Sequence, residues 1–122
     1  MKDRPTIIKI NGKEVPLWCD IYVLNEVQEE YGTIADFERK LAGIKEIEEN
    51  GKKQVCHVEP EVKTIIFALR LMVKEGYKKE ALLGEVREPV DVEELVIDVD
   101  IPFNQLADML HNEFRRCFAA KK

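Results

Sequence analysis

The dipeptide Asn11-Gly12 constrains the fold most, because it sets the register of a β-hairpin near the start of the chain. Both central residues of a type I′ turn need positive φ, and Asn-Gly is a favoured pair for that turn. A two-residue loop places Ile10 opposite Lys13 and Thr6 opposite Leu17. The apolar residues then share one face: Ile8, Ile10, Val15 and Leu17. A shift of one residue would mix the two faces, so this register is well specified.

Pro16 lies in the second strand of this hairpin, where a proline usually interrupts a hydrogen-bonded ladder. In the predicted register it faces Ile7 in a non-hydrogen-bonded pair, so its missing N–H points away from the first strand. We therefore expect the second strand to be an edge, and any further strand to pair beside the first. Lys9 and Glu14 form an opposite-charge pair on the outer face.

Ile7 and Trp18 share that outer face, and two interpretations are open. Trp18 either packs beneath a helix or a second hairpin, or it forms an exposed apolar patch together with Ile7. An exposed apolar patch is typical of a surface that meets another protein. Ile7 and Trp18 are therefore the candidate partner-binding residues.

Two short helices are predicted after the hairpin. Asp20 and Thr33 are typical N-cap residues, and Gly32 and Gly43 are typical helix stops. Asp36 follows Thr33 by three residues, as in a variant of the capping box.

Two longer helical patterns follow further along the chain. The segment 60–76 carries the broadest apolar stripe, so we predict a central helix that ends at Gly76. A last helix is predicted over 102–118, with these residues on its apolar side: Phe103, Leu106, Leu110, Phe114 and Cys117. Between the two helices we expect a single turn at 81–83 and a short helix over 91–97, although "VIDVDI" also alternates like a strand.

Residues 44–58 contain a second Asn-Gly dipeptide and have two interpretations. Ile44 and Ile47 could extend the preceding helix, or the segment could form a polar hairpin that pairs Glu49 with Lys52. We favour an exposed hairpin, because Gly43 and the Asn-Gly pair both interrupt a helix. The whole pattern predicts one α+β domain over 1–122, mostly α, with the N-terminal hairpin packed on four to five helices.

Charge and hydropathy exclude several classes of partner. The net charge is −5, and basic residues are interleaved with acidic ones, which is not typical of a nucleic-acid binder. No apolar run approaches the roughly 18 residues that a membrane span needs, and the start lacks a signal-peptide core. We therefore expect a cytoplasmic protein that binds neither nucleic acid nor membrane. Three widely spaced cysteines do not suggest a disulfide framework.

No catalytic or metal-binding pattern is present in the sequence. Cys56 and His57 are neighbours, so on a strand their side chains point to opposite faces and do not cooperate. The histidines and cysteines lack recognised ligand spacing. His111 and Glu113 are expected on the solvent-facing side of the last helix. We expect no enzymatic activity, no metal and no cofactor.

The order of the elements resembles a known family. The matching stretches are "INGKEVPL", "EEYG", a charged insert, "PEVKTIIFALRLMVKEG" and "NQLADMLHNEFRRCF". Together they resemble the small tail assembly chaperones of long-tailed bacteriophages, found in phages and prophages of Gram-positive bacteria. The resemblance covers most of the chain but consists of a hairpin and apolar helix patterns, without a catalytic signature.

This resemblance implies a protein that acts during assembly in the host cytoplasm and is absent from the mature virion. Such chaperones bind the tape-measure protein, keep it soluble and assist assembly of the tail-tube protein around it. Self-association is also expected. The alternative is a small phage or prophage regulatory or inhibitor protein that acts through protein–protein binding.

Overall fold

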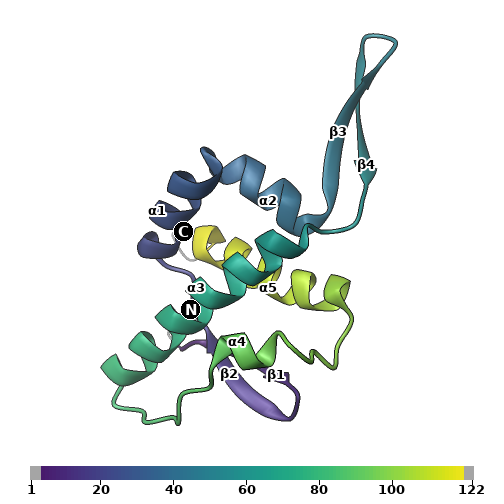
Figure 1. Cartoon of the computed structure of the whole chain (residues 1–122). Helices are drawn as coiled ribbons and strands as arrows, with labels where there is room; N and C mark the ends of the chain where they lie inside the picture. Colours follow the sequence, from purple (N-terminus) through teal and green to yellow (C-terminus); the bar gives the residue numbers. More distant parts are fainter. Residues whose placement is uncertain (1–3, 120–122) are drawn as a thin grey trace.

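Five helices and two separate β-hairpins make up residues 4–119, the part of the chain that the computed structural model describes (Figure 1). The fold is therefore α+β and mostly helical, as the sequence predicts. In chain order, the elements are β1 (Thr6–Ile10), β2 (Lys13–Leu17), α1 (Ile21–Tyr31), α2 (Ile34–Ala42), β3 (Ile44–Glu49), β4 (Lys52–His57), α3 (Val62–Leu82), α4 (Val92–Leu95) and α5 (Phe103–Ala119).

The first hairpin has the predicted register. Ile10 lies opposite Lys13 and Thr6 lies opposite Leu17, and Asn11 and Gly12 both have positive φ. Its apolar face is buried, which confirms the expectation drawn from alternation: Ile8, Ile10, Val15 and Leu17. The hairpin is therefore part of the core of the protein.

The outer edge of β2 is covered by α3. Pro16 is buried, and the N–H of Trp18, two residues further on, donates to the carbonyl oxygen of Met72 at 3.0 Å. Because Pro16 has no N–H, no donor is left unpaired against the helix at that position. Neither β1 nor β2 pairs with a third strand within residues 4–119.

The sequence prediction for Gly76 was wrong. We expected Gly76 to end the central helix, but α3 continues to Leu82 and includes most of the turn predicted at 81–83. A Cβ at Gly76 would collide with the carbonyl group of Pro16. The glycine therefore allows β2 to approach the helix. The helix ends at Leu82, two residues before Gly84, which has positive φ.

The caps of the two short helices are as predicted. The carboxylate of Asp20 accepts from the N–H groups of Tyr22 and Val23, at 3.0 and 3.1 Å. The hydroxyl of Thr33 accepts from the N–H of Asp36. The Asp36 carboxylate is paired with Arg39, so the reciprocal half of the capping box is replaced by an ion pair one turn along the helix.

Four aromatic rings join the helices α1, α2, α3 and α5. Tyr31 of α1 lies 5.3 Å from both Phe37 of α2 and Phe67 of α3, and Phe37 lies 5.1 Å from Phe114 of α5. The rings are tilted or edge-on, which is the favoured geometry for aromatic pairs. Phe103, which we predicted on the apolar side of α5, is instead exposed. The "VIDVDI" segment forms no strand, and the short helix α4 ends at Leu95, two residues before the predicted end.

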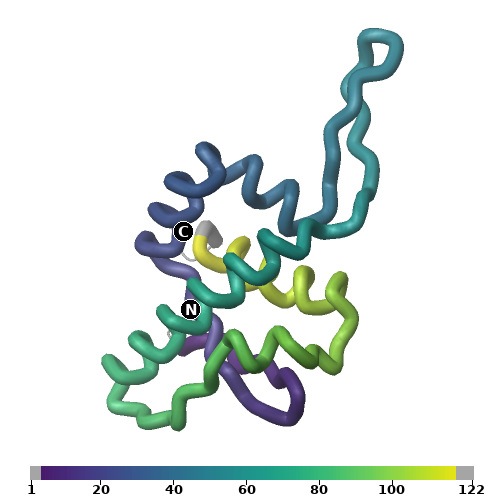
Figure 2. The backbone as a smooth tube through the Cα atoms, viewed as in Figure 1, coloured from purple at the N-terminus to yellow at the C-terminus, as the bar shows by residue number. Residues whose placement is uncertain are grey.

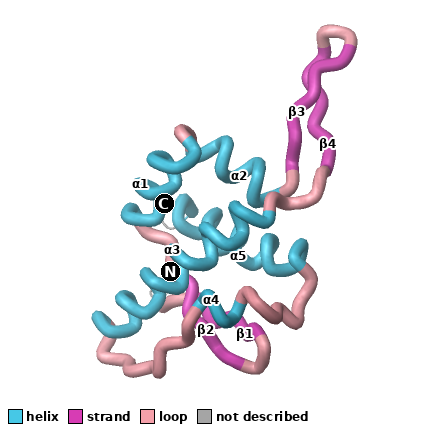
Figure 3. The backbone as a smooth tube through the Cα atoms, viewed as in Figure 1, coloured by secondary structure: helices cyan, strands magenta, loops and turns pink. Residues whose placement is uncertain are grey.

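The second hairpin projects from the body as an arm (Figures 2 and 3). Its register pairs Glu49 with Lys52, as predicted for the polar hairpin, so the alternative of a continued helix was wrong. The base of the arm is held by the N–H of Val58, which donates to the carbonyl of Gly43 at 2.8 Å. Gly43 has a φ of 73° and lies so close to Val58 that a Cβ would collide with its carbonyl oxygen.

We predict that Gly76→Ala destabilises the protein by about 1–3 kcal/mol, because the added methyl group separates α3 from β2. Helix propensity alone would predict the opposite, a gain of roughly 0.5–1 kcal/mol. Urea unfolding monitored by circular dichroism measures the change. Ala81→Gly, at an exposed position of the same helix, is the control, with an expected loss of up to about 1 kcal/mol from propensity. A stabilised Gly76→Ala protein would contradict the close contact.

Candidate partner-binding surfaces

Ile7 lies at the surface, beside the last helix. Its side chain is 39% exposed and lines a shallow pocket of about 400 Å³ together with Met109, Asn112 and Arg116. The pocket is open and mixes apolar and charged groups. Ile7 alone therefore offers a small apolar contact area.

Trp18 is half-buried and lies between two cations. The amino group of Lys79 is 4.8 Å from the ring centroid, and the guanidinium of Arg116 is 4.3 Å from it. Cations at these distances are attracted to the face of an indole ring. The structure therefore joins Trp18 to α3 and α5, in line with the packed interpretation, whereas Ile7 remains exposed. The role of the two residues in partner binding stays a prediction.

A buried carboxylate, Glu113, joins three segments beneath Trp18. It is 2% exposed and accepts from the Thr6 hydroxyl at 2.7 Å and from the Cys19 N–H at 3.0 Å. Arg116, one turn further along α5, donates to both of its oxygens, and this pairing raises the pKa of the arginine. Our expectation of a solvent-facing Glu113 was wrong. The helical pattern does not reveal partners that lie about a hundred residues away in sequence.

His111 was also expected on the solvent-facing side, but it is only partly exposed. Its Nε2 lies 2.9 Å from the carboxylate of Glu38 on α2, so the imidazole links two helices. The contact is part of the packing between α2 and α5.

A second buried carboxylate, Glu75 of α3, lies beside the N-cap of α1. Burial raises the pKa of Glu75, and a side-chain hydrogen bond to Asp20 raises it further. Lys78 has the opposite, smaller effect. The two carboxyl groups share a hydrogen bond, so a proton on Glu75 favours this arrangement.

The cysteines lie in two different environments. Cys19 and Cys117 are buried, and a hydrogen bond between their thiols, together with burial, raises the pKa of Cys19. Cys56 lies on the arm, where its Sγ is 3.6 Å from the carbonyl oxygen of Lys45. The described residues contain no cluster of three or more His, Cys, Asp or Glu side chains that could hold a metal ion.

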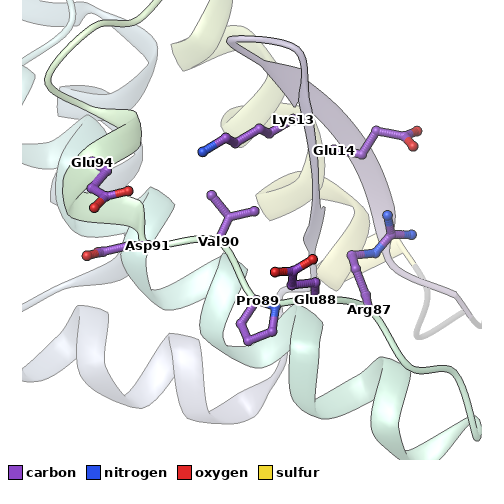
Figure 4. A pocket seen from close by; sticks show the side chains of 8 residues that line it. All are labelled: Lys13, Glu14, Arg87, Glu88, Pro89, Val90, Asp91 and Glu94. Carbon is purple, nitrogen blue, oxygen red and sulfur yellow. The ribbon is translucent and has the colours of Figure 1, made fainter.

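A pocket of about 520 Å³ lies between β2 and the loop before α4 (Figure 4). Lys13 extends across it with Val90 nearby, and acidic side chains lie at its margin (Figure 4). The lining residues are Lys13, Glu14, Arg87, Glu88, Pro89, Val90, Asp91 and Glu94. Arg87 is already paired with the buried Glu80 at 3.0 Å. Four of these side chains are acidic and two are basic, so the lining of the pocket is net acidic.

An exposed apolar surface borders a pocket at the base of the arm. We call it the arm-base surface and define it as Val58, Pro60, Val62 and Phe103. Val62 is 46% exposed and Phe103 is 53% exposed, and with Pro60 they line a depression of about 290 Å³. Glu59 and Asn104 form its polar margin. The helical pattern conceals this surface, because Val62, within the segment 60–76, and Phe103 both fall on stripes that we predicted to be buried.

None of the helices among residues 4–119 is long and apolar enough to cross a bilayer. Comparisons of the chain with models of protein families, with curated proteins and with solved structures found no match.

We predict that Glu113→Ala destabilises the protein by about 3–5 kcal/mol, because it leaves the half-buried Arg116 and the buried Cys19 N–H without their acceptor. Glu113→Gln, which keeps an acceptor oxygen and the shape, should cost less. Urea unfolding measures both changes. Glu93→Ala breaks an exposed ion pair with Arg70 and serves as the control, with a loss within about 1 kcal/mol. Equal effects at the two positions would contradict the network.

Glu75 gives the protein a predicted pH dependence. A carboxyl group whose pKa is raised on folding binds its proton more tightly in the native state. The stabilisation that comes from this tighter proton binding is therefore present at low pH and is lost as the pH rises above the usual glutamate pKa. Glu75→Gln stays neutral and does not lose this contribution. The melting temperature of the variant, measured relative to wild type, should therefore increase with pH from about 4 to 7. A difference that is constant with pH would contradict the shift.

Proposed function

We propose that this protein is a tail assembly chaperone of a long-tailed bacteriophage or prophage, which binds the tape-measure protein during assembly of the tail tube. The order of the elements along the chain supports this function. An "INGKEVPL" hairpin, two short helices, a charged insert and two longer helices follow one another as in that family. The charged insert of the sequence is the projecting arm of the structure.

The arm-base surface is the observation that carries the proposal. A tape-measure protein is a long helical chain, and an amphipathic helix binds other proteins through apolar residues that enter a groove. Val62 and Phe103 each begin a helix, and both leave half of their side chains exposed beside the depression. This surface supports binding of an apolar side chain from such a helix.

The polar margin of the surface suits the same partner. Glu59 and Asn104 border the depression, and the whole chain carries a net charge of −5. A hydrophobic centre with a polar rim is the usual anatomy of a protein–protein interface. An acidic surface also favours partner helices whose apolar stripe is flanked by lysine or arginine.

Co-expression with the tape-measure protein tests this function. We expect wild-type protein to increase the soluble fraction of the tape-measure protein and to co-purify with it. Phe103→Glu should reduce both, because it places a charge in the centre of the apolar contact. Val86→Glu is the matched control, since Val86 is fully exposed and lies outside the arm-base surface.

Melting temperatures of the two variants distinguish a loss of binding from a loss of folding. Both positions are exposed, so both proteins should keep the wild-type melting temperature. Equal solubilisation by wild type and Phe103→Glu would exclude the arm-base surface, and no solubilisation by wild type would exclude the chaperone function. A gene position beside the tape-measure gene would support the proposal, whereas a position among regulatory genes would favour the inhibitor alternative.

A further inference from the structure

The arm lacks the packing that usually stabilises a hairpin. All but three of the residues of β3 and β4 are exposed, and both strands stand clear of the helices (Figure 1). Only the base of the arm is held by further backbone hydrogen bonds: the N–H of Val58 donates to Gly43, and the N–H of Glu61 donates to Lys40. An isolated two-stranded hairpin is marginally stable in water, and a third strand or a covering helix is usually needed. Pairing with further strands would therefore stabilise the arm.

Both long edges of the arm carry unpaired backbone groups. The pair Glu49 and Lys52 closes the two-residue turn and is hydrogen-bonded, so hydrogen-bonded and non-hydrogen-bonded pairs alternate from there. Glu46 and Val55 form a non-hydrogen-bonded pair, and their N–H and C=O groups point away from the partner strand. Such an edge is a template for another strand.

The strand edges of the two hairpins differ in how they are protected from pairing with another strand. In the first hairpin, the outer edge of β2 is covered by α3, and Pro16 removes an N–H that would point outward from this edge. The arm has no proline between residues 44 and 57, and no helix among residues 4–119 covers it. Two of the means by which proteins prevent edge pairing, a proline and a covering helix, are therefore present in the first hairpin and absent from the arm.

The two edges of the arm have opposite charge. β3 carries one lysine and three glutamates, whereas β4 carries two lysines and no acidic residue. With His57 neutral, the net charges are −2 and +2. Two β3 edges repel each other, and so do two β4 edges, but β3 attracts β4. The edge that complements each strand is therefore present on every other copy of this chain.

We propose that copies of this protein associate through their arms, with β4 of one copy pairing antiparallel with β3 of the next. If all arms point the same way, this pairing continues one antiparallel sheet from copy to copy and leaves the helical bodies outside it. A neighbour in the same register sets Glu48 opposite Lys53 again. The contact is head-to-tail, so it propagates until a ring closes. This inference does not depend on the identity of the chaperone's partner.

Proline substitutions at the outward-facing positions test the pairing. Val55→Pro blocks the β4 edge and Glu46→Pro blocks the β3 edge, while neither removes a hydrogen bond within the arm. Pro16 occupies an equivalent position of the first hairpin. We expect the wild type to sediment as an oligomer and each variant as a monomer. An equimolar mixture of the two variants should form a heterodimer, because one free β4 edge and one free β3 edge remain.

Alanine controls distinguish the effect of the lost backbone N–H from the effect of the changed side chain. Val55→Ala and Glu46→Ala keep the outward N–H, so both should still associate. Circular dichroism checks that all variants keep wild-type secondary structure. A wild type that stays monomeric at every concentration would overturn the proposal, and so would oligomers that survive both proline substitutions. Self-association of one proline variant by itself would show pairing between like edges and would overturn the head-to-tail arrangement.

Hydrogen exchange of the wild type gives an independent test. The amides of Glu46 and Val55 point outward and should become protected as the protein concentration rises. The amides of Ile47 and Gln54 lie in a hydrogen-bonded pair within the arm and should be protected at all concentrations. Outward amides that exchange rapidly at every concentration would overturn the proposal, even if the proline variants fail to fold.

Discussion

The close approach of β2 to α3 is the contact on which the rest of the structure depends. Gly76 removes the side chain that would keep the strand away, and Pro16 removes the N–H that the helix could not satisfy. The N–H of Trp18 then reaches the carbonyl of Met72. With the strand in this place, the apolar face of the hairpin closes one end of the helical bundle and Trp18 lies between α3 and α5.

The ionic network around Glu113 depends on this arrangement. The carboxylate connects Thr6 at the start of the hairpin with Cys19 at the entrance to α1. Arg116 supplies the positive charge, and it also covers the ring of Trp18. Buried charges need this kind of full pairing, because removing one partner leaves the other without solvation. The network therefore ties α5 to the first hairpin and to the residue before the N-cap of α1.

The two hairpins have different roles in the proposals. The first packs its apolar face into the core and the outer edge of β2 against α3, so it belongs to the scaffold. The second is held at Gly43, where only a glycine allows the backbone of Val58 to come close, and it presents its edges to solvent. The arm-base surface lies where this arm meets the first turns of α3 and α5. In the proposed assembly, copies pair through the arms and a helical partner binds beside their base.

The sequence alone determined the features that depend on neighbouring residues. Asn-Gly dipeptides specify tight turns, and alternation specifies which side of a hairpin is apolar, so both registers were predictable. The caps at Asp20 and Thr33 follow from side chains that reach N–H groups two or three residues away. Only the tertiary structure decided the role of Gly76, the burial of Glu113 and the exposure of Phe103. Each depends on what lies opposite that residue in space, which local patterns do not encode.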